Sequence, residues 1–101
     1  MIARVWRGTV HSDKLDDYVD IVEETGMAEY RRTPGNLGAQ ILTRDLGDGR
    51  AEILTISWWP DVDHVRGFAG EDIEVAKYYP QDDPYLIDRD STVDHYFVAS
   101  D

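Results

Sequence analysis

The sequence contains three histidines, the residue type whose side chain has an ordinary pKa closest to neutral. His95 alternates with Val93 and Phe97 in the last predicted strand, so its side chain shares a face with theirs. If helices cover that face, His95 looks into a pocket, where a neutral imidazole could accept a proton from a substrate. His95 is therefore the candidate catalytic base. A hydrogen-bonded packing residue, or one at a dimer interface, is the alternative.

Large aromatic side chains gather between positions 58 and 79. Trp58 and Trp59 are adjacent in a predicted strand and must point to opposite faces, so at most one of them can line a given pocket. We assign Trp59 to substrate binding, with Phe68 and Tyr78, although the sequence leaves open which tryptophan faces the pocket. Tyr79 is the second candidate catalytic residue, because its hydroxyl could hydrogen-bond a substrate hydroxyl. Packing in the core is the alternative role for these rings.

Arg4 and His64 complete the set of candidate binding residues. Arg4 and Arg7 stand on opposite faces of the first predicted strand, so at most one of them lies on the pocket side. A buried Arg4 could stabilise a phenolate by charge-assisted hydrogen bonds, whereas exposure at a rim or pairing with an acid is the alternative. His64 lies at the edge of the apolar stripe of the second predicted helix, where it borders either the pocket or solvent. His11 falls in a loop and is expected at the surface.

Composition limits the classes of partner. The 101 residues are enough for one domain over 1–101, and 42% of them are hydrophobic. The formal net charge of -11 repels phosphate backbones and anionic lipid, so we expect no nucleic-acid or membrane partner. No segment has the roughly 20 apolar residues of a membrane span, and we expect a cytoplasmic protein. A domain this small would gain buried apolar surface by pairing with a second copy.

Metal and cofactor motifs are missing from the sequence. There is no cysteine, which excludes disulfides and thiolate ligands, and the three histidines have no ligand-type spacing. No glycine-rich phosphate loop or serine nucleophile elbow is present. We therefore expect no metal and no bound cofactor.

The order of the predicted elements is β-α-β-β-α-β. Strands are expected at 2–10, 37–43, 51–59 and 92–99, and a hairpin turn at 47–49. One helix runs from Asp13 to Thr33 and is loosened or kinked at Gly26, and a second follows Pro60. A short extra helix is expected after Gly70, through Ile73 and Ala76, before the last strand. With the helices on one face of the sheet, this is a ferredoxin-like α+β fold.

Several short segments in this order are similar to the antibiotic biosynthesis monooxygenase family, and the resemblance runs over nearly the whole chain. They are IARVWRG at the N-terminus, ETG at 24–26, TPGNLG at 33–38, Trp59 at a strand end, FAGEDI at 68–73, YYP at 78–80 and VDHY at 93–96. The resemblance implies a homodimeric α+β barrel, in which two sheets pack face to face and each pocket lies between a sheet and its own helices. Relatives include cofactor-independent monooxygenases, heme-degrading enzymes, isomerases and proteins without known activity.

The resemblance implies a cofactor-independent monooxygenase acting on an aromatic, polyphenolic or polyketide-like compound. A non-catalytic protein that binds a small ligand, or merely completes a dimer, is the alternative, and the sequence leaves open whether the chain is an enzyme. A cofactor-free isomerase would use the same pocket. Heme degradation ranks lower, because the first strand lacks the asparagine of those relatives and His64 comes early for their heme ligand.

Overall fold

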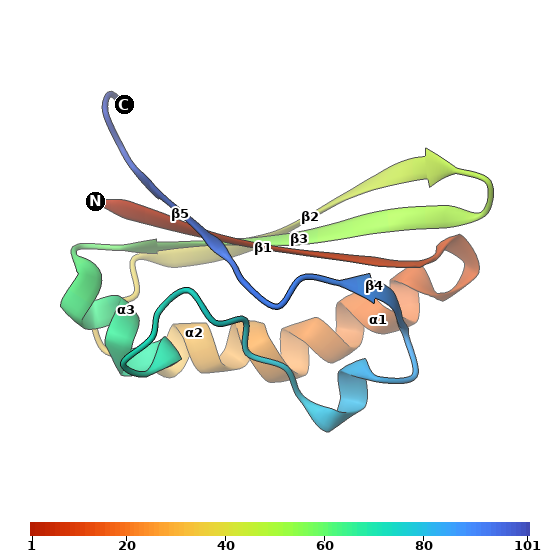
Figure 1. The fold of residues 1–101 in the computed structure, drawn as a ribbon, viewed down its shortest axis with the longest axis horizontal. Coiled ribbons are helices and arrows are strands. Elements are labelled where there is room, and N and C mark those ends of the chain that lie inside the picture. Colours follow the sequence, from red (N-terminus) through yellow and green to blue (C-terminus); the bar gives the residue numbers. More distant parts are fainter.

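The computed structural model describes residues 1–101, built around one antiparallel sheet. Its strands are β1 (Ile2–His11), β2 (Gly38–Gly47), β3 (Arg50–Trp59), β4 (Leu86–Arg89) and β5 (Asp94–Phe97), in the order β2-β3-β1 with β4 and β5 both on β1. β4 pairs with residues 8–10 of β1 and β5 with residues 2–5, so the two form one interrupted edge strand. Figure 1 shows this sheet with its helices on one side. The predicted ferredoxin-like α+β fold is confirmed.

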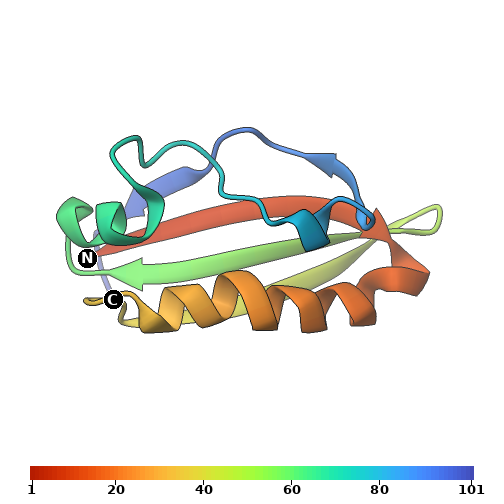
Figure 2. The same ribbon diagram turned by 90° about the horizontal axis from the view of Figure 1, so that it is seen from below.

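The helices cover one face of the sheet, as Figures 1 and 2 show. A 3-10 turn (Ser12–Lys14) leads into α1 (Leu15–Val22), a π-helical turn (Glu23–Met27) and α2 (Ala28–Arg32), which together form one rod. The predicted irregularity at Gly26 is thus a π-turn, a form common at functional sites. After β3, Asp61 caps α3 (Val62–Ala69) by accepting a hydrogen bond from the His64 amide.

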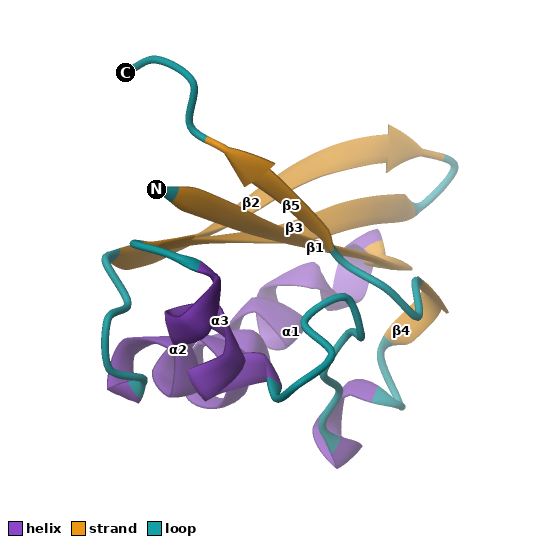
Figure 3. Ribbon diagram, turned by 60° about the vertical axis from the view of Figure 1, so that its left-hand side comes forward, coloured by secondary structure: helices purple, strands orange, loops and turns teal.

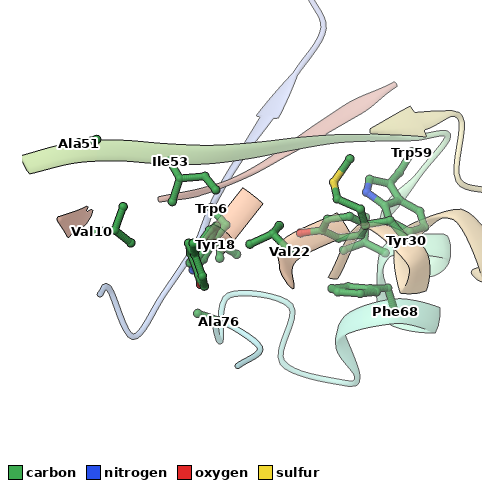
Figure 4. Packing of buried hydrophobic residues seen from close by; sticks show 13 residues of the cluster. Trp6, Val10, Tyr18, Val22, Tyr30, Ala51, Ile53, Trp59, Phe68 and Ala76 are labelled. Carbon is green, nitrogen blue, oxygen red and sulfur yellow. The ribbon is translucent and has the colours of Figure 1, made fainter. Parts of the chain in front are cut away.

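Strand alternation decides which side chains meet the helices. The β3 residues Ala51, Ile53, Thr55, Ser57 and Trp59 are buried, while the residues between them are partly exposed. Their partners across the sheet put Arg4 and Trp6 of β1 on the same, helix-covered face. Figure 4 shows the packed rings: Tyr30, Trp59 and Phe68 lie together near α3, and Tyr18 and Trp6 lie further along the sheet.

Residues 70–85, here called the strap, cross the helix side of the molecule before β4 (Figure 3). The sequence predicted a helix through Ile73 and Ala76, but Ile73 lies in a turn, Ala76 is in neither a helix nor a strand, and the extra helical turn lies at Pro80–Asp82. Ala76 instead donates a backbone hydrogen bond to Ser91 at 2.9 Å, which ties the strap to the segment between β4 and β5. None of the helices is long and apolar enough to cross a membrane.

Candidate functional site

A cavity of about 30 Å³ lies between the sheet and the elements that cover it. Arg4 and Trp6 reach it from β1, Thr55 from β3, Tyr30 from α2 and Phe68 from α3. Its volume accommodates about two water molecules, by the usual requirement of about 10–15 Å³ each. Dioxygen fits such a space, but an aromatic ring requires side chains or the strap to move.

Arg4 is the buried cation of the site, with 1% of its surface exposed. Its Nη1 donates to the Ile73 carbonyl and its Nη2 to the Val75 carbonyl at 3.2 Å, so two strap carbonyls hold the guanidinium. Its Nε is buried without a hydrogen-bond partner, and Arg4 belongs to none of the ion pairs. Burial lowers the pKa of Arg4, and the nearby Tyr30 phenol partly opposes that effect. The guanidinium still remains protonated at any physiological pH.

His95 lies against Arg4 from the neighbouring strand β5, with 3.1 Å between its Nε2 and Arg4 Nη1. Arginine has no acceptor, so Nε2 accepts this hydrogen bond and the imidazole is neutral with its proton on Nδ1. Burial and the charge of Arg4 lower the pKa of His95 below its usual value, and Asp94 opposes them. His95 is therefore a neutral base at pH 7, with its lone pair directed at Arg4.

Two hydroxyl groups stand beside Arg4 at the cavity wall. Tyr30 Oη and Thr55 Oγ1 are 3.3 Å apart, and one donates to the other. Whichever is the donor, the second hydroxyl keeps a hydrogen that it can offer to a ligand.

The strap is fastened to α2 at the cavity by one carboxylate. Glu29 accepts hydrogen bonds from Lys77 Nζ and from Tyr79 Oη. Burial favours a higher pKa for Glu29, but the bonds from Lys77 and Tyr79 outweigh it and the net pKa lies below the usual value. Burial, and then the bond to Glu29, raise the pKa of Tyr79 far above its usual value. Tyr79 is thus a hydrogen-bond donor and a poor proton acceptor in its own right.

A second fastening joins the strap to α1. Asp82, 4% exposed, accepts from Tyr18 Oη at 2.9 Å and from the Tyr79 amide at 2.8 Å. Burial and the adjacent Asp82 carboxylate raise the pKa of Tyr18 far above its usual value, so this phenol stays protonated. Both buried or half-buried acids beside the cavity, Glu29 and Asp82, are therefore committed to partners other than Arg4.

The structure brings some of the predicted site residues together and leaves others apart. Arg4, Phe68 and Tyr79 line the cavity, and His95 reaches it only through Arg4. Trp59 is fully buried behind Tyr30 and Phe68, where its indole donates to Ser57 at 2.9 Å. It lies on the helix-covered face, opposite Trp58.

Tyr78 and His64 lie outside the cavity lining. Tyr78 packs edge-on against Trp6, which donates to the Tyr78 hydroxyl at 3.2 Å. His64 is at the surface of α3, with its Nδ1 2.7 Å from the Asp61 carboxylate. Of the predicted binding and catalytic residues, Arg4, Phe68 and Tyr79 can therefore contact a ligand in the cavity, whereas Tyr78 and His64 do not line it.

Sequence reasoning did not name Tyr30, Thr55, Lys77 or Glu29 as site residues. Thr55 offered a signal, because it and Ser57 are the polar residues at inward positions of β3, where the other inward residues are apolar. The roles of Glu29 and Lys77 depend on the path of the strap, and they are 48 positions apart, so no local pattern joins them.

Comparisons with known proteins give a consistent picture of the fold. No protein-family model and no curated protein sequence matches the chain. Among solved structures, a protein from Bacillus cereus assigned to the antibiotic biosynthesis monooxygenases aligns with a TM-score of 0.67 and 17% identity, over 99% of this chain and 94% of that one. This chain has the antibiotic biosynthesis monooxygenase fold.

Two further structures with this fold have different descriptions. SnoaB, a cofactor-independent oxygenase from Streptomyces nogalater, aligns with a TM-score of 0.54 and 20% identity over 99% of this chain and 93% of SnoaB. A variant of MhuD with two manganese protoporphyrin IX molecules per active site aligns with a TM-score of 0.61 and 12% identity, over 100% and 97% of the two chains. At these identities the likeness establishes the shared fold, and the chemistry has to be argued from the side chains.

The side chains of this antibiotic biosynthesis monooxygenase fold do not fit a heme. No histidine lines the cavity, since His64 is at the surface and the Nε2 lone pair of His95 is taken by Arg4. No group of three or more histidine, cysteine or acidic side chains has the geometry of a metal site either.

Proposed function

We propose that this chain is a cofactor-independent monooxygenase that oxidises an aromatic, polyphenolic small molecule in the cavity between the sheet and its helices. The observation that supports it most is the pairing of aromatic walls with a buried arginine that has no carboxylate partner. A neighbour with the same fold, SnoaB, is described as a cofactor-independent oxygenase. Such a reaction asks the protein to bind and orient the substrate, exclude water and move one proton.

The reaction balances without a cofactor. A phenol with a free ring C–H, or an anthrone CH₂, reacts with one dioxygen to give the quinone or ketone and one water. One oxygen atom enters the ring, the other leaves as water, and the substrate supplies all the electrons. In the proposed site Arg4 binds a substrate oxygen and Phe68 lies against the ring.

Proton transfer is the role we propose for His95 and Tyr79. His95 is neutral and can accept a proton once a bound ligand replaces it on Arg4. Tyr79 Oη could accept a proton from a substrate hydroxyl while Glu29 accepts the proton that Tyr79 gives up. The remaining candidates, Trp59, Tyr78 and His64, contribute in this proposal only through packing or at the surface.

The proposed working form is a homodimer in the cytoplasm, joined through the face of the sheet that the helices leave open. That face carries a groove of about 780 Å³ with mostly hydrophobic walls, among them Leu54, Ile56 and Trp58. Apolar groups at this density on an uncovered sheet are typical of an interface.

A non-catalytic protein that binds a small ligand is the second candidate function. The small volume of the cavity and the engagement of His95 with Arg4 are the observations that favour it. A cofactor-free isomerase would use the same residues and is ranked below both.

Oxygen uptake tests the proposal. The protein, freed of metal by a chelator, is supplied with a panel of polyphenols and anthrones in a closed oxygen electrode. We expect uptake with one class of compound, lowered by about a hundredfold or more in His95→Ala, the usual loss for a general base. His11→Ala, which changes an exposed histidine, is the matched control and should retain full activity.

The melting temperature of each variant is measured beside its activity. Uptake lost in His95→Ala at an unchanged melting temperature supports a catalytic role. No uptake with any compound, together with a lower melting temperature in His95→Ala, favours the binding protein and makes His95 structural.

A further inference from the structure

Arg4 is a buried cation whose charge no group in the protein neutralises. Its two terminal nitrogens are held by neutral carbonyls and a neutral imidazole, and Phe68 offers its ring face at 5.5 Å. Glu29 is paired with Lys77 and Tyr79, and Asp82 with Tyr18 and the Tyr79 amide. A buried charge normally has an ionic partner, because leaving it unpaired is costly.

Three hydrogen-bond donors remain unassigned after the internal bonds are counted. Two belong to Arg4, which lines the cavity: the Nε–H, which is buried and unpartnered, and the second Nη2–H. The third is the spare hydroxyl hydrogen of the Tyr30–Thr55 pair. Donors beside one positive charge match the oxygens of a carboxylate.

The space next to these donors is also of carboxylate size. About 30 Å³ holds roughly two water molecules, comparable with the two oxygens of one carboxylate group and far too small for a ring. A ring attached to that group would lie toward Phe68 and Tyr79, where the strap closes the cavity.

A group that arrives already ionised can meet Arg4 directly, because in the structure described the bases near Arg4 are engaged. The His95 lone pair is occupied by Arg4, and Tyr79 donates its proton to Glu29. Carboxylic acids, with pKa values near 4, are ionised at pH 7, whereas simple phenols, near 10, are not.

We propose that the cavity selects aromatic carboxylic acids and binds their carboxylate at the Arg4 guanidinium and the Tyr30–Thr55 hydroxyl pair. This rests on the proposed function and refines its substrate class to a hydroxylated aromatic acid.

Titration calorimetry on the unmodified protein at pH 7 tests the proposal with matched ligands. Benzoate and 2-naphthoate are compared with benzamide and 2-naphthamide, which have nearly the same shape but no charge, and with 2-naphthol. We expect each acid to bind at least about tenfold more tightly than its amide and than the naphthol, as charge-assisted bonds are roughly twice as strong as neutral ones. Equal binding of acid and amide, tighter binding of the naphthol, or no binding of any of them overturns the proposal.

Variants then test which residues produce the preference for acid over amide. In Arg4→Gln the preference for acid over amide should fall to within about twofold, while Arg50→Gln, which changes an exposed arginine at the start of β3, should keep it. If Arg4→Gln does not fold, Thr55→Val, which removes one hydroxyl, should lower the preference severalfold. A preference that survives both changes contradicts the proposed site.

The outcome is separable from that of the proposed function. Selective binding of acids without oxygen uptake supports the carboxylate site and contradicts the oxygenase function. Oxygen uptake with neutral polyphenols, without a preference for acids, supports the oxygenase function and contradicts the carboxylate site.

Discussion

Arg4 shows why residue types alone did not define this site. The sequence favoured exposure at a rim or an ion pair, since buried arginines usually face acids. The structure buries it with carbonyl partners instead, from Ile73 and Val75 of the strap. Every residue but proline has an amide and every residue a carbonyl, so a sequence cannot show which carbonyl will face a given guanidinium.

His95 makes the stability of the fold depend on pH. Its folded pKa is lowered by burial and by Arg4, with Asp94 opposing, so the unfolded chain binds a proton at His95 at a higher pH than the folded chain does. Stability from this residue is therefore full above the unfolded pKa, near 6.5, and falls as the pH drops below it. We expect the urea midpoint to fall less between pH 7.5 and pH 5.5 in His95→Gln than in the unmodified protein.

The difference between the two proteins isolates His95, because carboxylates that titrate in acid contribute equally to both. His11→Gln, a change at an exposed histidine, should retain the full dependence on pH. Parallel pH profiles for the unmodified protein and His95→Gln would mean that the Arg4 contact leaves this imidazole unperturbed.

At the scale of elements, hydrophobic periodicity predicted the regular parts and failed at the strap. The strands of the 38–59 hairpin have alternating residues, and its turn needs positive φ at Gly47, Asp48 and Gly49, which those residue types tolerate. The spacing of Ile73 and Ala76 suggested a helix, but tertiary bonds to Ser91 and Arg4 hold that segment in a non-helical conformation. Contacts of such long range outweigh weak local propensity.

Glu29 is the point at which the strap should be easiest to release. In Glu29→Gln the ion pair with Lys77 is lost and the bond from Tyr79 becomes neutral, so we expect the strap to open more often. Hydrogen exchange measured by mass spectrometry should speed up severalfold in peptides covering 70–85, and little in β1 or β3. Because the pair is partly exposed, the change in global stability should be no more than about 1 kcal/mol.

Glu23→Gln supplies the matched comparison. Glu23 also pairs with a basic residue, Arg31, but on the exposed side of the helical rod and away from the strap. In Glu23→Gln, hydrogen exchange in the peptides covering 70–85 should proceed at the same rate as in the unmodified protein. Equal acceleration in both variants would show that loss of charge, and not release of the strap, is the cause.

At the scale of the whole molecule, the sequence predicted the fold class from the order of its elements and left the sheet with one uncovered face. Alternation on β3 places Leu54, Ile56 and Trp58 there, opposite the buried Thr55, Ser57 and Trp59. Which tryptophan faces the helices could not be read from the sequence, since shifting the register by one residue exchanges the two faces. The packing of Trp59 against Tyr30 of α2 and Phe68 of α3 settles it in favour of Trp59.

The uncovered face of the sheet leads us to predict a homodimer whose interface includes Trp58. A stable interface buries about 800 Å² per partner, and an apolar groove of this kind needs such cover because exposed apolar area favours association. We expect sedimentation equilibrium to give a dimer for the unmodified protein and a monomer for Trp58→Glu, which would bury a carboxylate in the interface. Leu46→Glu, at an exposed leucine near the hairpin end and outside the groove, should remain dimeric. A monomeric unmodified protein, or a dimer that survives Trp58→Glu, would place any self-association on another surface.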